Sequence, residues 1–154
     1  MAKAISETLR PHLVTIQLES KNQSDALKEV AGLLKDHPSM TNFDGFYAEL
    51  LQREKLESTC LGMETAFPHA RTDAVKNLVI AAGVSKEGIL FESTNQTVKL
   101  IFVIGTPKRM VTEYLAAVGA LARLLKEENL RNKLFSSKNS EEFIFHITEA
   151  ETKV

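Results

Sequence analysis

The chain has 154 residues, of which 44% are hydrophobic and 25% are charged, a balance that is ordinary for a globular domain with its own core. Its formal net charge is −1 and it has no long basic run, so a nucleic-acid-binding role has no electrostatic support. Cys60 is the one cysteine, which excludes an intrachain disulfide, and no apolar run approaches the roughly twenty residues that span a bilayer, so we expect a cytoplasmic protein without direct membrane insertion.

The N-terminal part of the chain is expected to form a strand and then a helix. Residues 12–18 alternate between apolar and polar side chains, which predicts the strand. Ser24 is the expected N-cap of the helix, in which apolar residues recur at helical spacing as far as about Asp36. His37-Pro38 follows, and the residue before a proline disfavours helical geometry, so the helix should end there.

A second helix and a shorter extended segment come next. Thr41 or Asn42 is expected to cap the helix, and Arg53 lies near its C-terminal end. Its predicted apolar face comprises Phe43, Phe46, Tyr47, Leu50 and Leu51. From residue 59 to residue 67 the spacing between apolar residues becomes shorter than in a helix, which indicates extended backbone.

Two apolar runs in the middle of the chain predict buried strands. The first covers residues 78–84, and a turn at Glu87-Gly88 is expected to separate it from residues 89–91. The second covers residues 98–104, and we expect Gly105-Thr106-Pro107 to close it.

The C-terminal part is predicted to be helical. A helix is expected over residues 111–126, with an inward face that comprises Val111, Tyr114, Leu115, Val118, Leu121, Ala122 and Leu125. Shorter helices are expected over residues 128–134 and, after an N-cap at Ser140, over residues 141–148.

Strands clustered between helical segments predict an α/β fold, with a mixed β-sheet covered by helices on both faces. No repeat, low-complexity segment or linker interrupts the pattern, so we expect a single domain over residues 1–154.

Pro68-His69 is the most informative pair of residues in the chain. Proline fixes its own φ and pushes Phe67 toward extended geometry. We therefore expect His69 at the end of a strand, where a loop presents its ring to a partner. On these two residues alone, the alternative is a turn histidine without chemical function.

The residues before His69 form a longer pattern. From Leu51 onward the sequence reads L-x-R-E-x-L-x-S-T-x-x-G-x-x-x-A-x-P-H. This pattern resembles the enzyme IIA domain of the bacterial phosphotransferase system (PTS), of the mannitol/fructose and nitrogen-regulatory type (type 2). The order of elements from Leu13 to about Glu149 is also similar to that family. The resemblance implies the mannitol-type IIA fold. It also implies that His69 accepts a phosphoryl group from HPr or its nitrogen-branch counterpart, and passes it to a IIB domain or keeps it as a signal for a regulatory target protein.

The chemistry of phosphoryl transfer suggests which side chains accompany His69. A neutral imidazole is nucleophilic near neutral pH, and transfer needs mainly positioning and charge stabilisation. Arg53 matches the family arginine whose guanidinium offsets the phosphoryl charge; the alternative is a solvated charge that favours the end of its helix. Thr59 either donates its hydroxyl to the phosphoryl group, fixes the His69 ring, or is a plain strand hydroxyl. We read Arg71 as a solvated charge on a loop.

Several kinds of site have no support in the sequence. There is no G-x-x-x-x-G-K-[ST] loop, no G-x-G-x-x-G element and no cluster of aspartates, so we expect no nucleotide cofactor and no self-phosphorylation from ATP. No H-x-x-x-H or H-x-H spacing occurs, so we expect no metal site and read His12, His37 and His146 as structural. Glu64 is expected to solubilise its loop, and Gly62 to permit a bend.

The chain departs from the family pattern at Tyr114. Many mannitol/fructose-type members carry a second active-site histidine at this position. A phenol can donate a hydrogen bond to a phosphoryl oxygen, but it stays neutral at pH 7 and supplies no positive charge; alternatively, Tyr114 is core. Two hypotheses therefore remain, a phosphohistidine carrier and a regulatory binding module that keeps the IIA fold without transfer. The Ser58-Thr59 pair in the motif and the separate-domain architecture favour the nitrogen-related, regulatory branch of the family.

Overall fold

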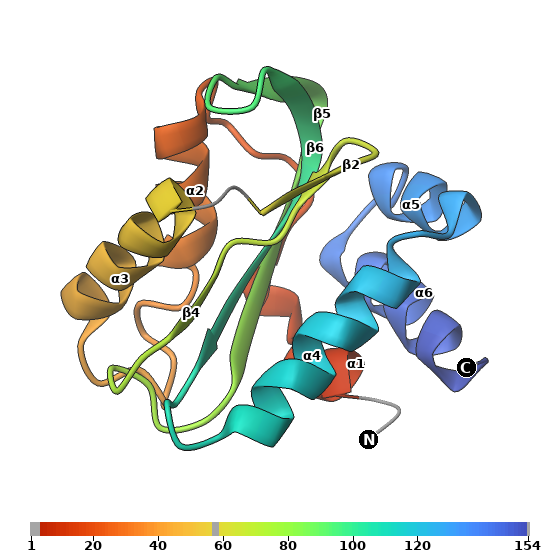
Figure 1. Ribbon diagram of the computed structural model, residues 1–154. Coiled ribbons are helices and arrows are strands. Elements are labelled where there is room, and N and C mark those ends of the chain that lie inside the picture. The colour runs from red at the N-terminus through yellow and green to blue at the C-terminus, as the bar shows by residue number, and fades with distance from the viewer. Residues whose placement is uncertain (1–3, 57–58, 154) are drawn as a thin grey trace.

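A mixed sheet of six strands forms the middle layer of the computed structural model, which describes residues 4–56 and 59–153 (Figure 1). The strands are β1 (Val14–Thr15), β2 (Cys60–Gly62), β3 (Thr65–Ala66), β4 (His69–Arg71), β5 (Val79–Phe91) and β6 (Gln96–Thr106). Their order is β1-β5-β6-β3-β2, and β4 also pairs with β6. The β5–β6 and β2–β3 pairs are antiparallel, whereas β1 runs parallel to β5, and β3 and β4 run parallel to β6.

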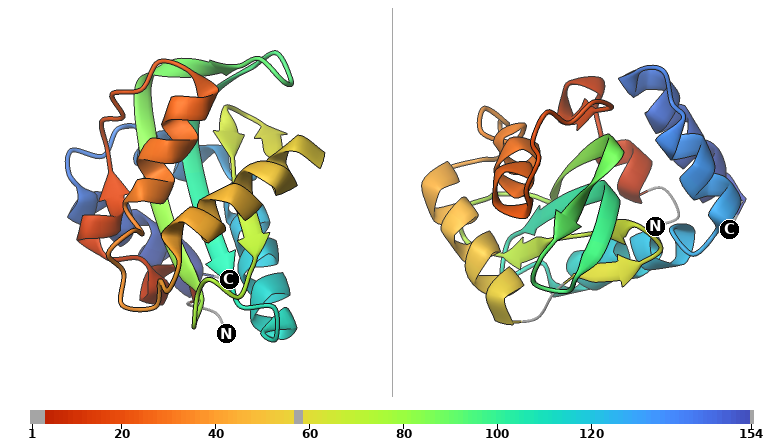
Figure 2. Two further views of the ribbon diagram at one scale, coloured as in Figure 1. Left: turned by 90° about the vertical axis from the view of Figure 1, so that its left-hand side faces the viewer. Right: turned by 90° about the horizontal axis from the view of Figure 1, so that it is seen from above.

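Helices cover both faces of this sheet (Figures 1 and 2). One face carries α2 (Gln23–Gly32) and α3 (Phe43–Leu56). The other face carries α1 (Ala4–Thr8), α4 (Val111–Leu124), α5 (Glu128–Phe135) and α6 (Ser140–Thr152). The predicted α/β architecture, with helices on both faces of a mixed sheet, is confirmed. In the described part of the chain, no helix is both long enough and apolar enough to cross a membrane.

The two apolar layers follow from the alternation of side chains along the long strands β5 and β6. Val79, Ala81, Ile101 and Val103 pack with the helices of the α2–α3 face. Ile80, Ala82, Phe102 and Ile104 pack with the helices of the opposite face. Because each face is covered, both sets of residues are apolar, which explains the continuous apolar runs in the sequence.

The predicted N-terminal strand is mostly wrong. The segment Pro11–Leu13 forms a 3-10 turn, since Pro11 suits the first position of a helical turn, and β1 is limited to Val14–Thr15. The chain then bends, although Leu18 still donates its N–H to the carbonyl of Val84 at 2.8 Å.

Two helix caps and one helix end also differ from the prediction. Asn22, and not Ser24, caps α2 by accepting the N–H of Asp25 at 2.9 Å, and α2 ends at Gly32. Asn139, and not Ser140, caps α6 by accepting the N–H of Glu142 at 2.8 Å. The asparagine stands two residues before the expected cap in α2 and one residue before it in α6, and in both cases it offers a side-chain carbonyl of suitable length. The predicted cap of α3 at Asn42 is confirmed by the bond that it accepts from Gly45 at 3.0 Å.

The predicted turn at Glu87-Gly88 is wrong, because β5 continues through it. The register of β5 against β6 shifts between Val84 and Ile89, so a bulge takes up the extra residues. Gly88 has φ 87° there, and its N–H donates to Oγ of Ser85 at 3.1 Å. The glycine therefore marks a left-handed residue inside a strand, and β5 turns into β6 at residues 92–95.

The exposed start of α4 is a further difference. Val111 and Leu115 are 43% and 62% exposed, although the periodicity places both on the inward face. The buried residues of this segment are Ala117, Leu121, Leu124 and Leu125. The packing of α4 against the sheet thus involves its later turns, and its first turns present apolar side chains to solvent. Similarly, β6 extends through Gly105 and Thr106 and does not close before them.

Candidate functional site

His69 lies inside the sheet. It is the first residue of β4, pairs with Ile104 of β6, and is 6% exposed. The expectation of a loop that presents the ring is therefore wrong. Phe67 and Pro68 separate β3 from β4, but the Pro68 carbonyl accepts the N–H of Ile104 at 3.0 Å, so the pairing with β6 resumes directly after the proline.

The imidazole of His69 is held in one orientation by the backbone. Nδ1 lies 2.9 Å from the carbonyl oxygen of Phe67. A carbonyl oxygen can only accept, so Nδ1 carries the proton and donates it. In the neutral ring the lone pair then resides on Nε2, which is the atom left free to act as a nucleophile.

The surroundings of His69 keep its ring neutral. Burial is the largest cause and lowers the pKa of His69 below its ordinary value. The hydrogen bond to the Phe67 carbonyl raises the pKa, the positive charge of Arg53 lowers it, and the negative charge of Glu54 raises it, in decreasing order of effect. Because the net direction is downward, the neutral nucleophilic form predominates at pH 7.

Two aromatic rings contact the imidazole. The ring of Phe67 stacks on it with a centroid distance of 5.6 Å and an interplanar angle of 20°. The ring of Tyr114, which comes from the first turn of α4, lies at 5.6 Å with a tilt of 46°. The guanidinium carbon of Arg71 lies 5.6 Å from the centre of the Tyr114 ring, and Nη2 of Arg71 donates to the carbonyl of Lys108 at 3.0 Å. Arg71 is exposed, as expected, but it belongs to β4 and not to a loop.

Arg53 reaches this region from the last turn of α3, which packs beside β4 (Figure 1). Its side chain is half-buried, and its charge is close enough to affect the titration of His69. The structure thus brings Arg53, His69 and Tyr114 to one place from three separate elements.

Thr59 contacts a residue to which the sequence reasoning assigned no function. Its hydroxyl donates to Oε1 of Glu54 at 2.8 Å, and its N–H donates to Oε2 of the same carboxylate at 3.3 Å. Glu54 also acts on His69 through its charge. The available signal was the Arg-Glu pair in the motif, since both side chains project from the last turn of α3.

Gly62 introduces a left-handed turn between β2 and β3. Its φ is 74°, so the predicted bend is confirmed, and Met63 and Glu64 follow with φ of 57° and 61°. Two successive residues of this kind form the hairpin turn whose twist suits the flanking strands, although glycine or asparagine is the usual occupant. Glu64 compensates in part, because its carbonyl accepts the N–H groups of Lys99 and Leu100 and its carboxylate lies 3.4 Å from the Lys99 ammonium.

The other histidines belong to different parts of the fold. His12 is exposed in the 3-10 turn, His37 accepts the N–H of Ser39 on Nδ1 at 2.9 Å, and His146 lies in α6. Within residues 4–56 and 59–153, no group of three or more histidine, cysteine, aspartate or glutamate side chains is arranged to hold a metal ion.

Comparison with known proteins identifies the family and the fold. Residues 7–150 match the family described as phosphoenolpyruvate-dependent sugar phosphotransferase system, EIIA 2. The PTS fructose-specific EIIABC component of Bacillus subtilis is 30% identical over 141 residues, which are 91% of this chain and 22% of that protein. The chain therefore spans about a fifth of the length of that relative.

Two shorter proteins match along most of their length. The PTS fructose-specific EIIA component of Haloferax volcanii is 29% identical over 87% of this chain and 88% of that protein. The crystal structure of nitrogen regulatory protein IIA-Ntr from Neisseria meningitidis aligns with a TM-score of 0.85 and 28% identity, over 94% of this chain and 99% of that one. This chain thus belongs to the EIIA 2 family of the phosphoenolpyruvate-dependent sugar phosphotransferase system.

Proposed function

We propose that the protein is a phosphohistidine carrier that accepts a phosphoryl group on Nε2 of His69. The donor is the phosphohistidine of an HPr-like phosphocarrier protein. The acceptor is a IIB domain, or the phosphate remains on His69 as a signal for a regulatory target protein. These exchanges place the protein in the cytoplasm, in agreement with its composition.

The hydrogen bond between Nδ1 of His69 and the carbonyl of Phe67 is the observation that carries this proposal. It leaves Nε2 with its lone pair, and burial keeps the ring neutral at physiological pH. A ring fixed in this way needs no rearrangement before it attacks phosphorus, which is the kind of positioning on which phosphoryl transfer depends.

The transfer step requires no proton to leave the site. The Nε2 lone pair forms a bond to phosphorus while the phosphorus–nitrogen bond of the donor breaks and its electron pair returns to the donor ring. His69 keeps the Nδ1 proton, so the phosphorylated ring carries a positive charge that the Phe67 carbonyl stabilises. The same positive charge makes the His69 ring a good leaving group, so the phosphoryl group can be transferred onward.

Arg53 and Tyr114 are the side chains that we assign to the phosphoryl oxygens. The guanidinium of Arg53 offsets their negative charge with two parallel donors. The phenol of Tyr114 offers one neutral hydrogen bond. Val111 and Leu115, on the same turns of α4, expose apolar surface beside Tyr114, which supports a partner protein docking over this part of the site.

The test is phosphorylation with phosphoenolpyruvate, enzyme I and HPr. We expect one acid-labile phosphate on the wild type, none on His69→Ala, and a normal level on His12→Ala, a matched control because His12 is exposed. Nuclear magnetic resonance of the product should place phosphorus on Nε2. An unlabelled wild type beside a labelled reference IIA protein, or equal labelling of His69→Ala, would rule the proposal out.

The contact between Tyr114 and His69 favours one alternative, a regulatory module that keeps the fold without transferring phosphate. A neutral phenol in place of an imidazole weakens the charge stabilisation of transfer. Affinity capture with wild type, His69→Ala and His69→Asp separates the two functions. Partners that ignore both substitutions support the module, and partners that discriminate between them support control by phosphorylation.

A further inference from the structure

One carboxylate near the site binds the backbone segment that leads to His69 through two hydrogen bonds. Oε1 of Glu54 accepts the Thr59 hydroxyl at 2.8 Å, and Oε2 accepts the Thr59 N–H at 3.3 Å. Thr59 is 5% exposed and Glu54 is half-buried, so these bonds are partly shielded from water, and both carboxylate oxygens bond one residue. Such a clamp fixes the position of the whole Thr59 peptide.

The clamped residue is linked to the imidazole through two further hydrogen bonds. The carbonyl of Thr59 accepts the N–H of Phe67 at 3.2 Å. The carbonyl of Phe67 in turn accepts Nδ1–H of His69 at 2.9 Å. A continuous series of hydrogen bonds thus runs from the Glu54 carboxylate, at the end of α3, to the ring in β4.

The segment that carries Phe67 interrupts the pairing with β6. Phe67 lies between β3 and β4, and the next residue, Pro68, has no N–H to donate, although its carbonyl accepts the N–H of Ile104 at 3.0 Å. On the other side, the N–H of Phe67 bonds the carbonyl of Thr59, which precedes the short edge strand β2. The direction of the Phe67 carbonyl therefore depends in part on its pairing with Thr59, and the position of Thr59 depends on Glu54.

We infer that Glu54 is a positioning residue: by holding Thr59, it directs the Phe67 carbonyl that keeps His69 in the Nδ1–H tautomer with Nε2 free. The consequence for transfer rests on the proposed function of His69, whereas the tautomer itself does not. Glu54 acts through the backbone, and the phosphoryl group need not touch it.

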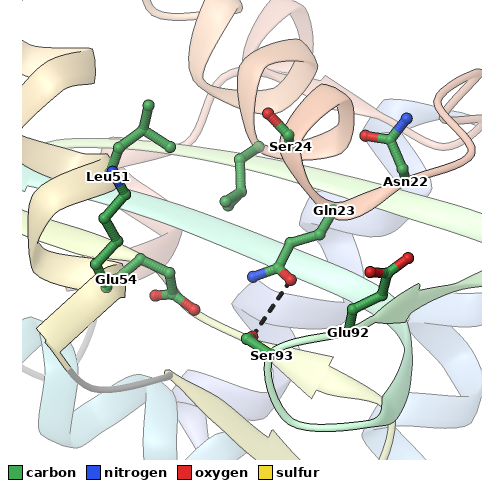
Figure 3. Close-up of a pocket in the computed structure, with 9 residues that line it drawn as sticks. Asn22, Gln23, Ser24, Leu51, Glu54, Glu92 and Ser93 are labelled. Atoms are coloured by element: carbon green, nitrogen blue, oxygen red, sulfur yellow. Dashed lines mark hydrogen bonds between the residues drawn. The ribbon is translucent and has the colours of Figure 1, made fainter.

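The opposite side of Glu54 is open, which makes the inference testable by a small substitution. Glu54 lines a cavity of about 530 Å³ between the start of α2, the end of α3 and the turn that joins β5 to β6 (Figure 3). Gln23 and Ser93, which line the same cavity, are bonded to one another at 3.3 Å. A leucine at position 54 fits this space, which Leu27 and Leu51 also line, but it has no hydrogen-bonding atom, so both bonds to Thr59 are lost.

The cavity also supplies a matched control. Glu92 lies on the β5–β6 turn, lines the same cavity as Glu54 and is exposed. Among the described residues, the carboxylate that Thr59 bonds is that of Glu54. Glu92→Leu therefore makes the same chemical change in the same cavity without altering the clamp.

The experiment is nitrogen-15 nuclear magnetic resonance of the His69 ring in wild type, Glu54→Leu and Glu92→Leu, above the pKa of His69. We expect the pure Nδ1–H tautomer in wild type and Glu92→Leu, and a mixture with the Nε2–H tautomer in Glu54→Leu. The phosphorylation rate of Glu54→Leu should fall about 10-fold, the size of loss found when a partner that orients a metal-ligating histidine is removed. A pure Nδ1–H tautomer in folded Glu54→Leu overturns the inference.

Two variants of Thr59 test the same link from its other end. Thr59→Val removes the hydroxyl and should give the mixed tautomer, whereas Thr59→Ser keeps both donors and should resemble wild type. The double variant Glu54→Leu with Thr59→Val should be no worse than Glu54→Leu alone, because Glu54→Leu already removes the bond that the Thr59 hydroxyl makes. If Glu54→Leu does not fold, the Thr59 pair decides the question by the same spectrum. An unphosphorylated wild type would overturn the proposed function and leave the tautomer result intact.

Discussion

The packing of α3 against the sheet depends on a glycine beside the site. Gly105 pairs with Ala70 of β4, and a Cβ atom at this position would lie 2.7 Å from Cε1 of Phe46 and 3.1 Å from Cγ2 of Val79. Phe46 is fully buried in α3, so its ring cannot swing into solvent. Gly105→Ala must therefore push α3, which carries Arg53, away from the strand of His69.

The size of this effect follows from the overlap. Adding one methyl group to a well-packed core costs about 1–3 kcal/mol. With a urea m value of about 1–3 kcal/mol/M, the unfolding midpoint should fall by about 1 M. The chain contains no tryptophan, so far-ultraviolet circular dichroism is the suitable probe. We also expect a lower phosphorylation rate in the folded variant, because Arg53 is displaced.

Gly32→Ala is the matched control for this prediction. A Cβ atom at Gly32 has nothing within 4 Å, and alanine suits a helix better than glycine by about 0.5–1 kcal/mol. The control should unfold at the same urea concentration as wild type or at a higher one. Wild-type stability of Gly105→Ala would refute the argument that Phe46 and the Gly105 backbone are in tight contact.

The remaining predictions concern charge at the site. The folded pKa of His69 lies below its unfolded value of about 6.5, so the unfolded chain binds the proton first as the pH falls. The contribution of His69 to the free energy of unfolding is therefore complete above about pH 6.5 and is lost as the pH falls through the folded pKa. The urea midpoint of wild type should drop relative to that of His69→Gln between about pH 7.5 and about pH 5.5, and a constant difference would contradict this. Arg53→Ala should raise the pKa of His69 and Glu54→Gln should lower it further, so resonance titrations that move both in one direction would be inconsistent with the assigned charges. Arg53→Ala should also slow phosphorylation about 100-fold, with a smaller loss in Arg53→Lys, as measured by phosphate incorporation. Tyr114→His should accelerate transfer and Tyr114→Phe should slow it slightly; equal rates in all three proteins would remove Tyr114 from the phosphoryl site.

The helices and long strands were predictable because their signals are local. The expected cap predicts the start of α3, and the sequence pattern predicts both bounds of α5 to within one residue; each helix buries one face. The apolar runs of β5 and β6 predict strands covered on both faces. The predictions failed where one residue type serves two geometries, as at Gly88, which a turn and a bulge accommodate equally.

The candidate site was predictable in part. The spacing between Arg53 and Pro68-His69 predicts a phosphoryl acceptor with a nearby cation, and the structure brings the Arg53 charge close enough to His69 to affect its titration. Glu54 was passed over although Thr59 is only five residues away, because the link from Thr59 to the His69 ring runs through the Phe67 backbone, which bonds Thr59 only once the hairpin of β2 and β3 has formed. Sequence spacing says nothing about which backbone carbonyl a ring will meet.

The sequence by itself determined the kind of protein: an α/β chain whose Pro68-His69 pair follows Arg53 at the spacing of a IIA motif. Tertiary structure decided the chemical state of that histidine. Burial, the Phe67 carbonyl and the charges of Arg53 and Glu54 set its pKa and its proton-bearing nitrogen. Solvent exclusion and the distances from His69 to Arg53 and Glu54 exist only once the sheet and α3 have packed together, and that packing also fixes the local backbone that turns the Phe67 carbonyl toward the ring.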